Sequence, residues 1–478
     1  MAEKKSSSTW YVHHIVTALL IFSGYILPVV EPLTREGMVL LMAFVGAIYG
    51  WTFINMLWPS IMAMFSMGLQ LGMAKVVAAG LGSPITWFLV FLYILIGLLN
   101  ETKIVEWIVS FFLSRKIVIG RPWTLITIIL IANFVGSLLS GFASLIIFLT
   151  FLFTMCKMVG IKPYSKFPTL MTAGIVLTIA LSAVVLPFKG TGLNFVIAWQ
   201  GVTGLAVDQL KFMIAAFPIC AFIIGMYVLI CRFVLRLDVS QLKEFNPADA
   251  GIKATKLTDD QKMALLVTAW ALVDMFIPVL FPTTAIGMFM TKITVFGQMA
   301  IPILVFMVVR FKDKPVVDFE LIVKKHLPWE MFMLMGVIMP LTSFLTADTT
   351  GIKALMGILV QPLVNLGTVG FLLLVALICL VLTNVATNFV VGMIFMPLVY
   401  AFAMATPTFS GEAALMVLVF ITHFAFLTPG ATPYAAIALS NGDWIRVGDM
   451  LKWGMPLALL LCLTCLPFIY LWSSFIMG

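Results

Sequence analysis

Catalytic and metal-binding side chains are scarce in this sequence. Asp, Glu, Lys and Arg make up only 10% of its 478 residues, and it has 4 histidines and 6 cysteines. It contains no zinc-binding His-Glu-x-x-His, no Gly-x-Ser-x-Gly elbow and no Walker loop. We therefore expect neither an enzyme nor an organic cofactor, and keep a membrane-embedded enzyme or a receptor as alternatives of a different class.

Apolar residues are abundant instead. The chain is 62% hydrophobic, with a mean hydropathy of +1.15. Runs of about 20 apolar residues can cross a hydrocarbon core, and the longest, from Val39 to Met67, is expected as one span. The cysteines lie in or beside such runs, so packing is their expected role. These features predict an all-α polytopic protein, a multi-pass integral membrane protein in contact with membrane lipid.

The net charge of +8 is explained by topology. Lys and Arg gather in short connections between apolar runs, and cytoplasmic loops carry such an excess. The connections "MAEKK", "LSRKIVIGRPW" and "NGDWIRVGDMLKW" are therefore assigned to the cytoplasm. We expect a cytoplasmic amino terminus, no cleavable signal sequence, a plasma membrane location and no nucleic acid partner.

Two apolar segments each contain a short group of polar residues near the middle, which we call a polar knot. Residues 122–156 lie between two basic connections, so a single span would place these connections on opposite sides of the membrane. A re-entrant hairpin that turns at Ser140-Gly141 keeps both inside. Residues 367–404 lie between two connections poor in basic residues, which predicts a second hairpin entering from outside and turning at Thr387-Asn388.

Landmarks recur at nearly one period along the chain. The pairs are Trp87 and Trp329, 242 positions apart, Ser140 and Thr387, 247 apart, and Pro187 and Pro429, 242 apart. They indicate an inverted repeat over 80–236 and 323–478, with scaffold helices in 1–79 and 263–322 and a cytoplasmic connector at 237–262. Such a repeat is typical of alternating access.

Each half also contains a hydrophobic span interrupted by Pro, Gly and Thr. The breaks fall near 187–194, "PFKGTGLN", and near 428–435, "TPGATPYA". A broken helix frees backbone groups, whose carbonyl ends suit a cation and whose amino ends suit an anion. Two hairpin tips and two broken spans are the parts of a cation-coupled anion carrier.

The sequence resembles the divalent anion:sodium symporter family, within the superfamily that includes citrate and dicarboxylate carriers. The similarity rests on the paired tips, on "VLTNVATNF", on "ATPYAAI" and on the late "IRVG", and it covers essentially the whole chain. It implies about eleven transmembrane helices plus two re-entrant hairpins, and a homodimer of elevator type. It also implies a secondary active transporter of a small organic anion, carboxylate or related, coupled to sodium. A sodium-independent anion exchanger or efflux carrier is the alternative.

In that family each tip reads Ser-Asn-Thr, and the tips with the broken spans hold two sodium ions. Here the second tip keeps suitable oxygen donors, and the resemblance implies one sodium ion held by Thr383, Ala386, Asn388 and Ala431. The first tip has lost these donors, because it reads Ser140-Gly141-Phe142 and has Gly136 where a further hydroxyl is expected.

The expected substrate-binding residues come from both tips and both breaks. They are Ser140, Gly141, Phe142, Lys189, Gly190, Thr191, Asn194, Thr387, Asn388, Phe389, Thr432 and Pro433. Lys189, in the same half as the altered tip, is interpreted as a tethered cation that replaces the missing sodium. It could instead extend to the membrane interface, or pair with Asp208 or Glu101.

Other polar residues in apolar runs have open roles. Asp274 could relay protons, and His423 could titrate or simply be packed and hydrogen bonded. Phe142 and Phe389, at equivalent places in the two tips, are candidates for apolar pocket walls. Glu101 and Glu106 are expected to pair with Lys103 at a helix end.

Overall fold

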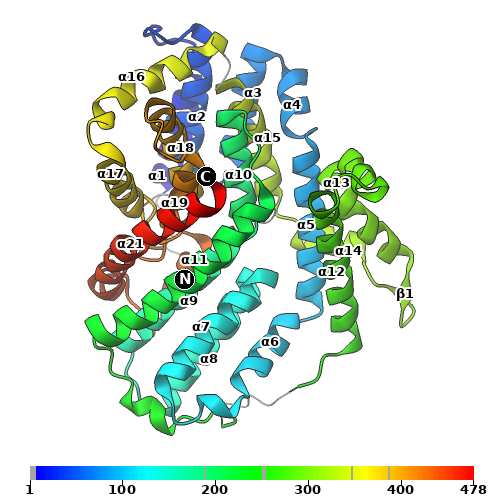
Figure 1. Ribbon diagram of the computed structural model, residues 1–478, viewed down its shortest axis with the longest axis vertical. Helices are drawn as coiled ribbons and strands as arrows, with labels where there is room; N and C mark the ends of the chain where they lie inside the picture. Colours follow the sequence, from blue (N-terminus) through cyan, green and yellow to red (C-terminus); the bar gives the residue numbers. More distant parts are fainter. Residues whose placement is uncertain (1–6, 188–189, 250–254, 346–347, 386–387) are drawn as a thin grey trace.

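The protein is almost entirely helical, as a computed structural model shows for residues 7–187, 190–249, 255–345, 348–385 and 388–478 (Figure 1). Eight of the described helices are long and apolar enough to cross a membrane, or up to 11 if each bent pair is counted as one span. The predicted all-α polytopic fold is therefore confirmed. The two strands, β1 (Arg310–Phe311) and β2 (Lys314–Pro315), form only a short antiparallel hairpin.

Four helices precede the first half. They are α1 (Ser7–Ser23), α2 (Arg35–Phe53), α3 (Leu57–Leu71) and α4 (Met73–Gly80). The single span expected from Val39 to Met67 is wrong, because α2 ends and α3 begins inside this run. The reason is Asn55, whose side-chain oxygen accepts hydrogen bonds from the amides of Leu57 and Trp58 at 3.0 Å and so starts a new helix.

Seven helices follow in the first half, and seven in the same order make up the second. The first set is α5 (Pro84–Glu101), α6 (Ile104–Leu113), α7 (Pro122–Leu139), α8 (Gly141–Met158), α9 (Lys166–Val184), α10 (Gly190–Thr203) and α11 (Gln209–Leu229). The second is α15 (Trp329–Leu345), α16 (Ile352–Val364), α17 (Gly367–Leu382), α18 (Asn388–Ala405), α19 (Gly411–Thr422), α20 (Pro433–Leu439) and α21 (Val447–Met477). Short turns η1 (Lys116–Val118), η2 (Ile230–Val234) and η4 (Asp348–Thr350) accompany them.

The two sets match in register as well as in order. Helix α8 begins at Gly141 and α18 at Asn388, 247 residues later, and α10 begins at Gly190 and α20 at Pro433, 243 later. Position 141 therefore corresponds to Asn388, and Thr191 corresponds to Tyr434. The opposite orientation of the halves in the membrane stays a prediction.

Both polar knots coincide with breaks between helices. Helices α7 and α8 lie side by side and are joined through Ser140 alone (Figure 1). Helix α17 ends at Leu382 and α18 begins at Asn388. By length and composition alone, α7, α8 and α18 could each cross a membrane, so their re-entrant character stays a prediction.

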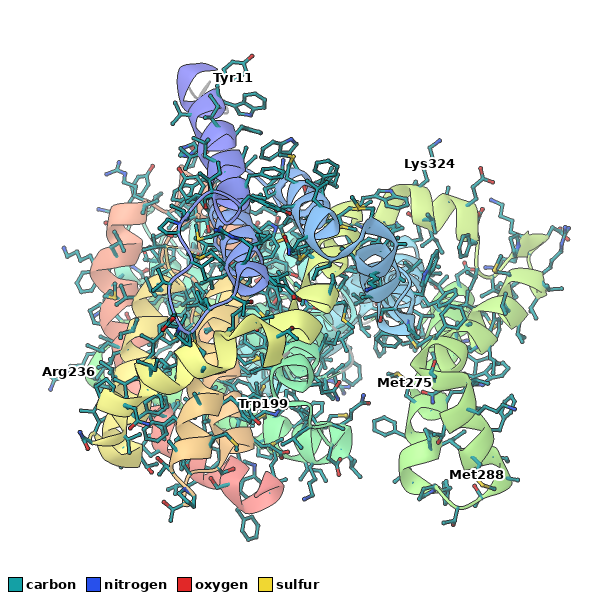
Figure 2. All side chains as sticks on the ribbon, turned by 90° about the horizontal axis from the view of Figure 1, so that it is seen from above. Tyr11, Trp199, Arg236, Met275, Met288 and Lys324 are labelled. Atoms are coloured by element: carbon teal, nitrogen blue, oxygen red, sulfur yellow. The ribbon has the colours of Figure 1, made fainter. Side chains whose placement is uncertain are left out.

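Between the halves, the chain forms η3 (Ser240–Glu244), α12 (Asp259–Leu280), α13 (Ala285–Val308) and α14 (Phe319–His326). Helices α12, α13 and α14 lie beside α5, away from α7 and α9 (Figure 1). The α12–α13 pair, which carries Met275 and Met288, projects from the main body (Figure 2).

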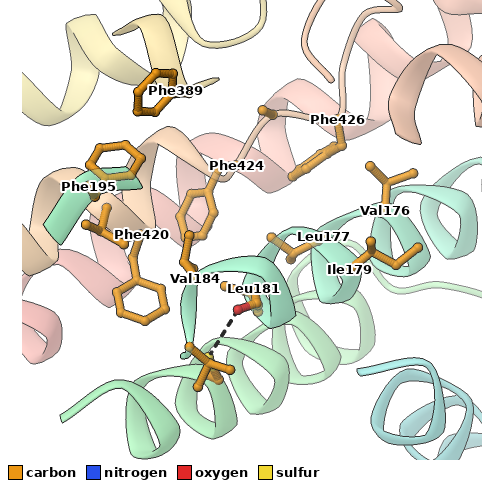
Figure 3. Close-up of a cluster of buried hydrophobic side chains, with 14 of the residues drawn as sticks. Val176, Leu177, Ile179, Leu181, Val184, Phe195, Phe389, Phe420, Phe424 and Phe426 are labelled. Atoms are coloured by element: carbon orange, nitrogen blue, oxygen red, sulfur yellow. Dashed lines mark hydrogen bonds between the residues drawn. The ribbon is translucent and has the colours of Figure 1, made fainter. Parts of the chain in front are cut away.

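Aromatic and aliphatic side chains fill the centre of the main body. Phe420, Phe424 and Phe426 of α19 and the break after it lie against Leu177 and Val184 of α9 (Figure 3), and all of these are buried. Helix α9 is buried on nearly all sides. A span this enclosed packs inside protein, and it therefore holds the two breaks in a fixed relation to each other.

Candidate substrate and ion site

Asn384 ties the second hairpin tip to the broken span after α19. Its side-chain amide donates to the carbonyls of Leu380 and Phe424, both at 2.9 Å. Its side-chain oxygen accepts from the amides of Phe426 and Leu427 at 3.1 and 2.9 Å. Its donors and its acceptor are thus satisfied by main-chain groups, three of them in the break and one near the end of α17.

Two further contacts close this junction. The Thr428 hydroxyl donates to the Asn384 carbonyl, and the Thr383 hydroxyl donates to the carbonyl of Thr422. A side-chain carbon at Gly430 would lie 3.2 Å from the Val385 carbonyl oxygen, so the break and the tip touch through their backbones. Thr383 and Ala431 are fully buried here.

The structure describes three of the predicted sodium ligands, and two of them, Thr383 and Ala431, lie in segments that contact each other. Thr383 lies in the tip, Ala431 lies in the break, and the two segments are hydrogen bonded through Asn384. The Asn388 oxygen accepts from the Phe389 amide at 2.8 Å. Ala386 and Thr387 lie outside the described residues. Neutral oxygen donors of this kind suit a hard monovalent cation, and no group of three His, Cys, Asp or Glu converges elsewhere in the described parts of the chain.

The first tip is held by a different polar network. Asn133 of α7 donates to the Ile175 carbonyl at 2.9 Å and to the Thr178 hydroxyl at 2.7 Å, both on α9. The Ser144 hydroxyl donates to the Asn133 side-chain oxygen at 2.8 Å. Ser140 itself caps α8 by accepting from the Ala143 amide at 3.4 Å. These contacts join both arms of the tip to α9.

Each tip packs against a short helix of the opposite half. At the first tip, a side-chain carbon on Gly141 would lie 2.8 Å from the Tyr434 hydroxyl oxygen of α20, and the Phe142 and Tyr434 rings are 4.8 Å apart. At the second tip, Phe389 contacts Phe195 of α10, with ring centroids 5.9 Å apart (Figure 3). Phe389 is buried, whereas Phe142 is half exposed.

The beginning of α10 also contacts the second break. Thr191 Oγ1 lies 2.9 Å from Nε2 of His423, and Nδ1 of His423 lies 2.7 Å from the Val419 carbonyl. Asn194 is buried, and no described residue donates a hydrogen bond to its side-chain oxygen. Gly190 begins α10, and Lys189 lies outside the described residues.

The remaining predicted substrate residues begin α20. The Thr432 oxygen accepts from the Ala435 amide at 3.0 Å and caps this helix, and Pro433 is its first residue. Pro suits this place because its missing amide hydrogen would have no partner in a first turn.

Three carboxylates considered in the sequence have the following places in the structure. Glu101 does not form the expected pair with Lys103, because His326 and Lys325 lie 2.8 and 3.3 Å from its carboxylate. The left-handed backbone of Lys103 marks the break between α5 and α6. Asp208 caps α11 by accepting from the Leu210 and Lys211 amides. Asp274 is buried in α12, away from the tips.

Sequence reasoning missed Asn384, Asn133 and Tyr434. Asn384 lies inside "VLTNVATNF", but of the two asparagines in this segment only Asn388 is predicted to bind sodium. Tyr434 follows directly on Thr432 and Pro433 in "ATPYAAI" and corresponds by the repeat to Thr191, which is one of the predicted substrate-binding residues. The period of the repeat was the signal that could have found it.

Comparison with known proteins agrees with this architecture. The fold is similar to that in "Crystal structure of the Alcanivorax borkumensis YdaH transporter reveals an unusual topology", with a TM-score of 0.57 and 16% identity over 85% of this chain and 89% of that one. None of the curated proteins matches the sequence. The family model for the sodium:sulfate symporter transmembrane region matches residues 200–478. The chain therefore belongs to the sodium:sulfate symporter family, as the resemblance predicts, and is a sodium-coupled anion transporter rather than an enzyme.

Proposed function

We propose that the protein is a symporter that moves a compact organic anion together with a single sodium ion by an elevator mechanism. The observation that carries the proposal is the junction of Asn384 with the second break, which brings the segments of Thr383 and Ala431 into contact. Neutral oxygen donors of this kind match what a sodium ion needs, whereas the first tip carries glycine at positions 136 and 141.

The substrate site would lie between the tips and the short helices. Phe142 and Phe389, which meet Tyr434 and Phe195, supply apolar walls where a tip could otherwise carry a hydroxyl. Such walls favour an anion with an apolar body and a single acidic group over a C4 dicarboxylate.

Lys189 would provide the second positive charge at the site. An anion without a neighbouring cation is strongly disfavoured in a low-dielectric cavity. Asp208 and Glu101 are engaged elsewhere, and the Asn194 oxygen, five positions after Lys189, has no donor among the described residues. These contacts support a functional role for the lysine over a structural ion pair.

A homodimer and an elevator motion are supported by the outlying α12–α13 pair. Its exposed surface is apolar, with Val273, Ile286 and Met288 each more than half exposed. Such a surface must meet lipid or a second copy of the chain. A scaffold of this kind would stay fixed while the tips and breaks move.

Uptake by sealed proteoliposomes tests the function directly. Radiolabelled sulfate, succinate and methanesulfonate are offered separately, with and without an inward sodium gradient. We expect sodium-stimulated uptake of unchanged methanesulfonate, with weak competition by succinate. Equal uptake without sodium would favour the exchanger or efflux carrier, and tight competition by succinate would contradict the proposed substrate class.

A further inference from the structure

The two tips differ in how side-chain size is distributed between the tip residue and the corresponding residue of the short helix. At the second tip, position 388 is Asn and the corresponding residue of the short helix, Thr191, is small. At the first tip, position 141 is Gly and the corresponding residue, Tyr434, is large. At the first tip, the bulk therefore lies on the short helix rather than on the tip residue.

Gly141 and Tyr434 pack closely against each other. An added side-chain carbon at position 141 would lie 2.8 Å from the Tyr434 hydroxyl oxygen and 3.0 and 3.1 Å from two ring carbons. These distances are shorter than ordinary van der Waals contact, so Tyr434 at its observed place requires a glycine here. The Phe142 ring also lies near it, with ring centroids 4.8 Å apart.

The Tyr434 hydroxyl is available for a ligand. It makes no hydrogen bond with any residue in the described ranges, and Tyr434 is half-buried rather than enclosed. Ser140 beside it is used to cap α8.

We infer that the Tyr434 hydroxyl donates a hydrogen bond to the uncharged end of the substrate anion at the first tip. This assignment rests on the proposed function and deepens it, because it names a specificity-determining residue of the same site. A phenol donates one hydrogen bond and carries no charge, so this end of the site accepts an oxygen acceptor without a full second negative charge. The preferred substrate class is therefore a monoanion whose far end is a neutral hydrogen-bond acceptor.

Anion-dependent thermal stabilisation of the purified full-length protein tests this inference. The probes are methanesulfonate, succinate and succinamate, in which one carboxylate of succinate is replaced by an amide, each at saturating sodium. The wild type should bind succinamate more tightly than succinate. Tyr434→Phe should raise the half-maximal concentration for succinamate about tenfold, which corresponds to one hydrogen bond to a ligand.

Two tip variants separate the hydroxyl from simple packing. Gly141→Asn should displace the phenol and weaken anion binding as Tyr434→Phe does. Adding Tyr434→Thr to Gly141→Asn copies the pair found at the second tip and should restore thermal stability without restoring anion affinity. Wild-type affinity in Tyr434→Phe, or equal affinity of the wild type for succinate and succinamate, would overturn the inference.

The outcomes distinguish this inference from the proposed function. Uptake that needs no sodium but falls in Tyr434→Phe would refute sodium coupling and keep the role of the tyrosine. Sodium-driven uptake that is unaffected by Tyr434→Phe would refute the role of the tyrosine and keep sodium coupling. A wild-type protein stabilised by none of the three anions would overturn both.

Discussion

Thr191 Oγ1 and His423 Nε2 are 2.9 Å apart and join the short helix of the first half to the break of the second. Because a carbonyl can only accept, the 2.7 Å contact with Val419 places the hydrogen of the neutral ring on Nδ1. Nε2 is then an acceptor, and the Thr191 hydroxyl donates to it. The pair fixes the first turn of α10, where the substrate is expected to bind.

Thr191→Val should weaken transport through this pair. The substitution keeps the side-chain shape but leaves the buried His423 nitrogen without its partner, at a cost of about 1–3 kcal/mol. We expect a several-fold rise in KM for uptake, whereas Thr191→Ser should stay near the wild type. A double-mutant cycle with His423→Ala measures the coupling, and additive effects would show that the contact has no energetic role.

Asn388→Ala should abolish sodium-dependent uptake. The side chain is expected to contribute an oxygen to the ion, and sodium is held by several such donors at once. Sodium titration of uptake checks this, with Asn365→Ala, at the end of α16, as a matched control. Sodium activation of normal affinity in Asn388→Ala would show that the ion binds elsewhere.

Asn384→Leu should destabilise the fold rather than alter sodium affinity alone. It would leave the amides of Phe426 and Leu427 and two carbonyls without partners inside the protein. With about 1–3 kcal/mol for each unsatisfied group, the loss should exceed that of an ordinary core substitution. Thermal unfolding in detergent checks this. A melting temperature equal to that of Asn133→Leu would agree with the prediction, because Asn133 ties the first tip in a similar way. A melting temperature equal to that of the wild type would contradict it.

Gly392→Ala should separate the second tip from α10. The added carbon would lie 2.1 and 2.2 Å from two ring atoms of Phe195, so the ring must move. Overpacking of this kind costs about 1–3 kcal/mol. Phe195→Leu in the same chain should recover part of the stability and of the uptake, and failure of this rescue would mean that the clash falls on another element.

The family and the helical fold could be predicted from the sequence, but the pairing of the elements could not. Apolar runs and polar knots are local features, so the helix breaks at Ser140 and before Asn388 lie where composition changes. The repeat period shows which residues correspond. It does not show that each tip packs on the short helix of the other half, because the contacts of Phe389 with Phe195 and of Gly141 with Tyr434 join residues far apart in sequence.

The same limit explains the errors at single residues. Asn55 divides a run that hydropathy treats as continuous, because its capping bonds depend on side-chain geometry. Glu101 pairs with Lys325 and His326, more than 200 positions away, rather than with its helical neighbour. A nearby opposite charge predicts a pair only when the helix continues, and here it breaks at Lys103.

Lys189→Ala should lose anion binding, because the tethered ammonium is expected to supply the charge that a second sodium ion would otherwise bring. A lysine at membrane depth costs about 2.5–3.5 kcal/mol to insert, so a merely structural role would need a partner. Lys189→Arg keeps the charge and should retain part of the binding. The wild type should then show a Hill coefficient for sodium of about one, since one ion and one fixed charge suffice.

Binding of methanesulfonate and the sodium dependence of its uptake are measured together for these variants. Lys211→Ala, in the first turn of α11, is the matched control because it also removes one positive charge from the first half. Normal anion binding by Lys189→Ala would make the lysine structural. Cooperative activation of the wild type by two or more sodium ions would show that the first tip still binds an ion, in which case the ammonium adds to the coupling charge instead of replacing it.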